Sequence, residues 1–197
     1  LKAFMDETAS ESPAPGGGSV SAYMGALGVA LGTMVANLSS HKRGWDDRWK
    51  EFSDLAEKGK VIQNNLLQLV DEDTAAFNRI IEAFALPKKS EEEKQVRNVA
   101  IQEATKNATL IPFKVMETAF SGFELILEMV EKGNPNSITD AGVGALALRS
   151  CIKGAFLNVK INASGLQDKD FAKTIIARGE DLETKAVAAE EEILIII

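Results

Sequence analysis

The chain has few of the residues that build metal centres, disulfides and nucleophilic triads. Its 197 residues include a single cysteine, Cys151, and a single histidine, His41. One cysteine cannot form an internal disulfide, and one Cys with one His cannot make a thiol and imidazole zinc site. We therefore expect no metal and a reducing compartment. Because the N-terminal segment also has no apolar secretory signal, we expect a cytoplasmic location.

Positive charge is also scarce. The 22 lysines and arginines face 29 aspartates and glutamates, so the formal net charge is −7. A nucleic-acid-binding protein needs a basic face that displaces phosphate counterions, and the charge balance therefore argues against nucleic acid as a partner. The hydrophobic fraction of 45% and the charged fraction of 26% are typical of a globular chain. The length predicts a single domain over residues 1–197.

Asp, Glu, Lys and Arg are absent altogether from residues 12–41. The part between Val20 and Leu38 is about long enough to span a bilayer, which takes roughly 20 residues. It consists mainly of Gly, Ala, Ser and Met, whereas membrane insertion favours Leu, Ile and Phe. We therefore predict no membrane span but a buried helix. One of its faces carries only small residues, which permit close helix packing: Ser21, Gly25, Gly28, Gly32 and Ala36.

Alternating strand patterns are missing, and helical periodicity recurs along most of the chain. Two capping-box patterns, Ser90 with Glu93 and Ser137 with Asp140, predict helix starts. Pro112 predicts a kink or a break in the helix that contains it. The fold class predicted is all-α, a bundle of long antiparallel helices joined by short connections. The predicted helices cover residues 2–10, 19–38, 47–85, 90–132, 137–163 and 168–192.

A glycine-rich segment precedes the uncharged helix. Gly16, Gly17 and Gly18 let the backbone approach a ligand closely, and Ser19 follows them. The free N–H groups at a helix N-terminus favour an anion or a carboxylate. The segment lacks the Lys-Ser/Thr pair and the preceding strand of a nucleotide-binding P-loop. A flexible connector capped by Ser19 is the alternative interpretation.

One acidic residue falls on an apolar helix face. Asp73 continues the line of Leu66, Leu69 and Phe77 at spacings of three and four, whereas Asp71 lies nearly opposite. A carboxyl group directed at a core or a cleft has its pKa raised by desolvation unless it is paired, which suits a general acid or base. The alternative is a buried aspartate satisfied by a neighbouring donor.

Two further groups of polar residues are candidates for binding. Asn158 and Asn162 end an otherwise apolar face in the 137–163 helix, where their amides need a partner, either a ligand or the next helix. His41, Lys42 and Arg43 follow the end of the uncharged helix. They either complement the helix dipole or bind an acidic ligand.

Three segments taken in order, PAPGGGSVSA, LVDEDTAAF and GNPNSITDAGVGALALRS…GAFLNVKIN, resemble the cyclodeaminase/cyclohydrolase family that acts on one-carbon tetrahydrofolates. The resemblance implies a homodimer or larger assembly, a tetrahydrofolate derivative as substrate, no cofactor, and a formiminotransferase as a partner. It implies a catalytic carboxylate within Val70–Phe77, which we assign to Asp73, with Asp71 as the alternative. We expect the substrate in one cleft formed by Gly16, Gly17, Gly18, Ser19, Asn134, Asn136, Ser137, Asp140, Asn158 and Asn162, with Lys42 and Arg43 near the glutamate tail.

The implied reaction closes 5-formiminotetrahydrofolate to 5,10-methenyltetrahydrofolate and releases ammonia. A carboxylate near both nitrogens can accept one proton and deliver another. The same site suits a methenyltetrahydrofolate cyclohydrolase, in which water takes the place of ammonia. From a different class, the chain could be a non-catalytic helical oligomerisation module, in which Asp73 is structural.

Overall fold

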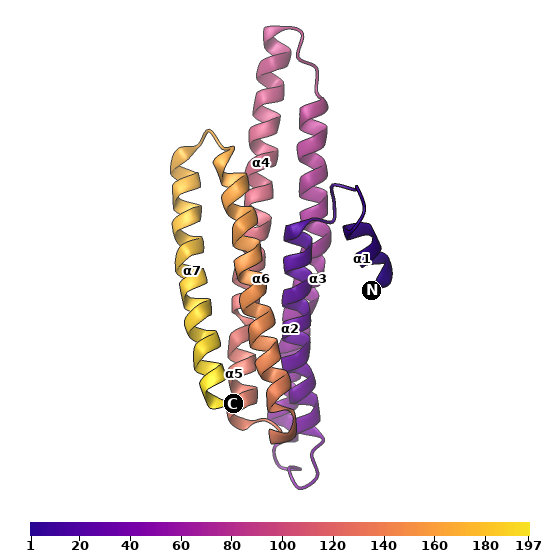
Figure 1. The fold of residues 1–197 in the computed structure, drawn as a ribbon, viewed down its shortest axis with the longest axis vertical. Coiled ribbons are helices and arrows are strands. Elements are labelled where there is room, and N and C mark those ends of the chain that lie inside the picture. The colour runs from indigo at the N-terminus through magenta and orange to yellow at the C-terminus, as the bar shows by residue number, and fades with distance from the viewer.

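A computed structural model describes residues 1–197 as seven α-helices and one short 3₁₀ helix, with no strand (Figure 1). The predicted all-α bundle of long helices is confirmed. The elements are α1 (Lys2–Thr8), α2 (Gly17–Ser40), α3 (Trp49–Ala85), α4 (Glu91–Phe120), α5 (Gly122–Lys132), η1 (Pro135–Ser137), α6 (Ile138–Ser164) and α7 (Lys169–Ile196).

The uncharged helix α2 packs against both α3 and α6. A Cβ at Gly28 would lie 2.8 Å from the carbonyl oxygen of Gly144 in α6, so the two backbones meet there without side chains between them. By length and composition α2 could cross a membrane, but 61% of its apolar window is buried inside the bundle. The prediction of a closely packed, buried helix is thus confirmed. Cys151 lies in the same contact, and burial raises the pKa of its thiol to about 12.

Of the kink or break predicted at Pro112, the break is wrong. α4 runs through Pro112 to Phe120, and the break falls at Ser121. Proline has no N–H to bond the carbonyl four residues earlier, which belongs to Ala108. The side-chain amide of Asn162 in α6 donates to that carbonyl instead, at 2.7 Å. A bond between helices therefore replaces the one that proline removes from its own helix.

The two predicted capping boxes have different outcomes. Ser90 and Glu93 form theirs at the start of α4. The one at Ser137 and Asp140 is wrong, since the Ser137 hydroxyl donates to the carbonyl of Asn134 at 3.2 Å and caps no helix N–H. The 3₁₀ turn η1 precedes α6 directly and takes the place of a separate cap. The final helix also continues past the predicted end at Glu192, to Ile196.

The two ends of the bundle are formed by different helix ends. At one end the α3–α4 hairpin projects beyond α2 and α6 (Figure 1). α2 begins and α6 ends near the base of this projection, while α2 ends and α6 begins at the opposite end (Figure 1). The 24 residues of α2 span about 36 Å at the α-helical rise. Residues at the two ends of α2 are therefore far apart within one chain.

Candidate active site

A pocket of about 330 Å³ lies at the end of the bundle where α2 begins. The loop before α2 forms one wall, and α3, α4 and α6 contribute the others. The lining residues are Pro13, Ala14, Gly16, Gly17, Gly18, Asp73, Phe77, Ile80, Ala108, Asn158, Ile161 and Asn162.

α2 begins two residues before the predicted start at Ser19. The helix begins at Gly17 with Gly16 as its N-cap, so Ser19 lies inside the first turn and does not cap it. The buried Ser19 hydroxyl donates to Oδ2 of Asp73 at 2.8 Å. It also lies 3.2 Å from the hydroxyl of Thr74, which can donate to it in turn. The predicted carboxylate site at this helix N-terminus is thus occupied by the protein's own Asp73.

Asp73 is half-buried and no charged neighbour contributes to its titration. Burial raises the pKa of its carboxyl group above the ordinary value of 3.8. Hydrogen bonds from the hydroxyl and the backbone N–H of Ser19 favour the charged form and lower the pKa, but burial is the larger effect. The pocket therefore holds a single carboxyl group whose acid form persists to higher pH than in water.

Asp71 and Glu72, the two acidic residues directly before Asp73, do not face the pocket. Asp71 is exposed and lies outside the pocket. Glu72 accepts a hydrogen bond from Gln68 at 2.7 Å and pairs with Lys114 at 3.6 Å. The prediction that Asp73 alone of the three faces a cleft is confirmed, and its catalytic role remains a prediction.

The two predicted amides lie across the pocket from Asp73, on the last two turns of α6. Nδ2 of Asn158 donates to the carbonyl oxygen of Gly154 at 3.0 Å, and Nδ2 of Asn162 donates to Ala108. A Cβ at Gly17 would lie 3.2 Å from Nδ2 of Asn158, so the glycine segment touches α6 directly. The structure thus brings together the three glycines, Ser19, Asp73 and both amides.

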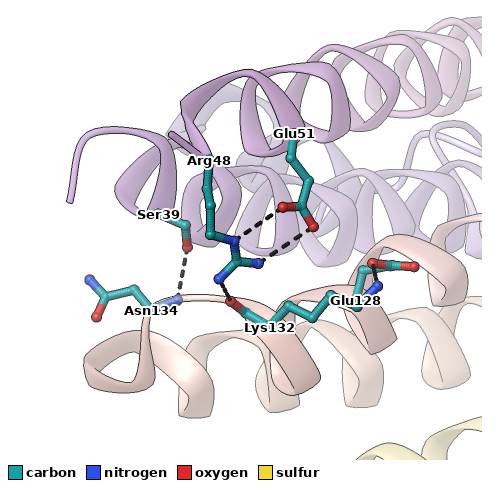
Figure 2. A network of polar contacts seen from close by, with 6 residues as sticks. All are labelled: Ser39, Arg48, Glu51, Glu128, Lys132 and Asn134. Atoms are coloured by element: carbon teal, nitrogen blue, oxygen red, sulfur yellow. Dashed lines mark hydrogen bonds and ion pairs between the residues drawn. The ribbon is translucent and has the colours of Figure 1, made fainter. Parts of the chain in front are cut away.

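The remaining predicted residues lie at the opposite end of the bundle: Asn134, Asn136, Ser137, Asp140, Lys42 and Arg43. Figure 2 shows the backbone N–H of Asn134 donating to the hydroxyl of Ser39, at 2.8 Å, near the end of α2. The Arg48 guanidinium, paired with Glu51, donates to the carbonyl of Lys132 nearby (Figure 2). The prediction of one cleft that holds both groups is therefore wrong for a single chain. The motif from 133 to 162 covers nearly all of α6, so its two ends lie at opposite ends of that helix.

His41 and Lys42, which follow α2, line a second and polar pocket. Nζ of Lys42 lies 3.8 Å from the centre of the Trp45 ring, and Arg43 is exposed. This pocket has a volume of about 500 Å³ and is lined by Asn37, Ser40, His41, Lys42, Asp46, Trp49 and Ser53.

Sequence reasoning missed the apolar part of the site at Asp73. Phe77 and Ile80 lie one and two helical turns beyond Asp73 on α3, and Ile161 adjoins Asn162 on α6. Phe77 was placed on the face of Asp73 but not assigned to the site, and the spacing of four and seven residues from Asp73 could have identified both Phe77 and Ile80. No cluster of three or more His, Cys, Asp or Glu side chains is placed to hold a metal ion. The absence of a cofactor stays a prediction.

The fold and the pocket define a class: a helical-bundle protein with one half-buried carboxyl group in a pocket beside a helix N-terminus. Comparison with known proteins then gives the family. A model of the formiminotransferase-cyclodeaminase family matches residues 1–181. The chain belongs to this family, which confirms the resemblance seen in the sequence.

Individual relatives in this family carry two kinds of name. A methenyltetrahydrofolate cyclohydrolase of Methylorubrum extorquens is 37% identical over 98% of this chain and 93% of that protein. The formimidoyltransferase-cyclodeaminase of Rattus norvegicus is 35% identical over 96% of this chain, which spans only 35% of the rat protein. The crystal structure of a formiminotetrahydrofolate cyclodeaminase from Thermotoga maritima superposes with a TM-score of 0.87 at 28% identity, covering 100% of this chain and 94% of that one. The chain is thus a member of a family of folate-processing enzymes.

Proposed function

We propose that the protein is a formiminotetrahydrofolate cyclodeaminase, which closes 5-formiminotetrahydrofolate to 5,10-methenyltetrahydrofolate and releases ammonia. The observation that carries the proposal is Asp73, a half-buried carboxyl group with a raised pKa that lines the pocket together with the glycines and both amides. Family membership supplies the substrate class, and the pocket supplies a group able to do the chemistry.

The reaction needs two proton movements at one carbon. N10 of the folate attacks the formimino carbon attached to N5 and gives a tetrahedral centre that bears two ring nitrogens and an amino group. N10 must lose a proton, and the amino group must gain one before the C–N bond breaks and ammonia leaves. One carboxylate near both nitrogens can accept the first proton and deliver the second. Because the ring closure is intramolecular, holding N5 and N10 close supplies much of the remaining acceleration.

The environment of Asp73 suits both halves of this cycle. The raised pKa makes the carboxylate a stronger base and keeps its acid form available nearer to neutral pH. The Ser19 hydroxyl donates to Oδ2 and holds the carboxylate in one orientation. The negative charge also stabilises the cationic amidinium substrate and the cationic methenyl product.

A second candidate is methenyltetrahydrofolate cyclohydrolase, in which Asp73 activates water that attacks the methenyl carbon. One observation favours it. The Methylorubrum extorquens relative of that name matches along 93% of its length, whereas the rat protein matches over only 35% of its own. The same tetrahedral carbon with a hydroxyl group in place of the amino group serves this reaction.

Turnover on the two substrates, assayed separately, tests the proposal. Purified protein with 5-formiminotetrahydrofolate is expected to produce the methenyl absorbance and an equal amount of ammonia. With 5,10-methenyltetrahydrofolate, the absorbance is expected to decay no faster than in buffer. Enzymatic decay with no ammonia-releasing activity would replace the proposed function with the cyclohydrolase. Absence of both would favour the oligomerisation module.

We further propose that the protein is a homodimer joined through the outer faces of α2 and α6. These helices pack side by side (Figure 1). α2 carries no charge, and large apolar side chains are exposed on both helices: Leu27, Met34, Leu38, Val143, Leu146, Leu157 and Ile161. A face two helices wide and as long as α2 offers roughly 700 Å² per copy, near the ~800 Å² per partner of a standard interface.

A two-fold axis perpendicular to these helices would place the two copies antiparallel. The end of the bundle where α2 begins would then lie beside the partner's opposite end. The acidic segment before α2, with Asp6, Glu7 and Glu11, would then lie near the partner's Lys42 and the partner's Arg43, so opposite charges would meet. The substrate's glutamate tail could then reach basic residues of the second copy.

Cytoplasmic location and a formiminotransferase partner also remain proposals. Support for the partner comes from the rat relative, whose name joins the two activities in one longer protein. A separate formiminotransferase would supply the 5-formimino substrate to this chain.

A further inference from the structure

Pro112 lies inside α4, where proline is costly, and it is buried beside the proposed folate site. Its missing N–H leaves the carbonyl of Ala108 without the donor that normally lies four residues along the same helix. Ala108 lines the pocket, and Nδ2 of Asn162 donates to its carbonyl at 2.7 Å. A proline in α4 therefore creates the acceptor that holds a side chain of α6.

This bond fixes which end of the Asn162 amide is available to a ligand. A carbonyl accepts only a donor, so the nitrogen of the amide must face Ala108. The oxygen, Oδ1, then has no protein donor, yet no buried side-chain oxygen in the chain lacks a partner. Oδ1 is therefore accessible, on a residue that lines the pocket. Asn158 repeats the pattern, since its nitrogen is committed to the carbonyl of Gly154.

The side chains of the pocket therefore present three acceptor groups to a ligand. The three groups are Oδ1 of Asn158, Oδ1 of Asn162 and the carboxylate of Asp73. The Ser19 hydroxyl donates its hydrogen bond to Asp73. These three acceptors favour a ligand that carries N–H groups, because an acceptor that meets another acceptor is desolvated without gaining a hydrogen bond. A tetrahydropterin ring and a formimino group both carry N–H donors.

We propose that Pro112 is a positioning residue of the folate site: it leaves the Ala108 carbonyl free to anchor the nitrogen of Asn162, which holds the Asn162 oxygen as an acceptor for an N–H group of the substrate. The inference rests on the proposed function for the identity of the ligand. Its structural part, the dependence of the Asn162 amide on Pro112, does not.

Pro112→Ala tests the proposal because it restores the N–H that competes for the Ala108 carbonyl. The Asn162 amide is then free to rotate. We expect KM for 5-formiminotetrahydrofolate to rise about three- to tenfold, the effect of one hydrogen bond, with kcat unchanged because the contact binds substrate and transition state alike. Pro87→Ala is the matched control, since Pro87 is exposed in the turn between α3 and α4. If Pro112→Ala fails to fold, Pro112→Ser restores the same N–H.

A double-mutant comparison separates positioning from simple packing. Asn162→Ala is expected to raise KM, and adding Pro112→Ala to it is expected to change nothing further, because no amide remains to be positioned. Independent, additive increases in KM would overturn the proposal. So would an unchanged KM in the folded Pro112→Ala protein.

Hydrogen exchange tests the positioning role of Pro112 without any measurement of turnover, so its outcome does not depend on the proposed cyclodeaminase activity. The side-chain NH₂ signals of Asn162, identified by their loss in Asn162→Ala, should exchange slowly with solvent in the wild type and fast in Pro112→Ala. Binding of 5-formyltetrahydrofolate should weaken in the same variant. Slow exchange that persists in Pro112→Ala overturns the inference. The predicted exchange change in a protein that binds no folate would instead refute the proposed function alone.

Discussion

The carboxylate of Asp73 lies against the Cα of Gly18, in the volume that a side chain at residue 18 would need. α2 and α3 approach this closely because residue 18 is a glycine, and the next residue, Ser19, then reaches Oδ2 of Asp73. The glycine segment therefore serves to admit a carboxyl group from another helix to the N-terminus of α2. The two motifs form one unit although 54 residues separate Ser19 from Asp73.

Gly18→Ala is expected to reduce kcat/KM about 100-fold, the loss that a displacement of roughly 1 Å can cause at a reacting group. The new Cβ would collide with the Asp73 carboxylate and push it aside. Gly16→Ala is the matched control, since its Cβ would meet nothing closer than the Pro13 carbonyl oxygen at 3.7 Å. Equal activities of the two variants would contradict the account.

Ser19→Ala is expected to move the acidic limb of the pH–rate profile to higher pH. The Ser19 hydroxyl lowers the pKa of Asp73, so its removal lets burial raise that pKa further. The base form of Asp73 would then appear only at higher pH. The profile of kcat/KM against pH measures the shift, and a shift toward lower pH would refute the role given to this hydrogen bond.

Asp73→Asn is expected to stabilise the protein at neutral pH. Since the folded-state pKa of Asp73 lies above its ordinary value of 3.8, the wild type loses stability as pH rises from 3.8 through the folded-state pKa. Asparagine does not titrate, so the stability gained by the variant should grow over the same pH range. Urea unfolding from pH 3 to 8 measures this difference. Asp71→Asn, at an exposed position, should show no such trend.

Leu157→Glu is expected to dissociate the proposed dimer and to reduce activity with it. Leu157 is 55% exposed on the α6 face, and a charge there would be desolvated at the interface. Val61→Glu is the control, because Val61 is 60% exposed on α3, outside the proposed face. Light scattering coupled to size-exclusion chromatography reports the mass. A wild-type monomer, or a Leu157→Glu dimer, would refute the interface.

Mixing two inactive variants tests whether the partner completes the site. Asp73→Asn mixed with a Lys42→Glu/Arg43→Glu double variant should recover about a quarter of wild-type activity, since half of the randomly assorted dimers carry one intact site. No recovery after verified subunit exchange would mean that the basic residues do not act on the partner's pocket.

The sequence allowed the fold class and the orientation of Asp73 to be predicted, because both depend on helical periodicity. Local spacing could not predict which helix ends meet. Asn134 and Asn162 belong to one motif, yet α6 carries them to opposite ends of the bundle. Likewise, Pro112 was expected to kink or divide its helix, yet α4 continues through it, and the amide that bonds the Ala108 carbonyl comes from another helix, which local spacing does not reveal.

Turnover by Asp73→Asn tests the central claim most directly. The variant should fold and bind 5-formyltetrahydrofolate as the wild type does, while kcat on 5-formiminotetrahydrofolate falls by about 100- to 10,000-fold, the range for loss of a general acid or base. Asp71→Asn, made in parallel, should keep wild-type turnover. Retained kcat in Asp73→Asn would contradict the account, and a matching loss in Asp71→Asn would transfer the catalytic role to that residue.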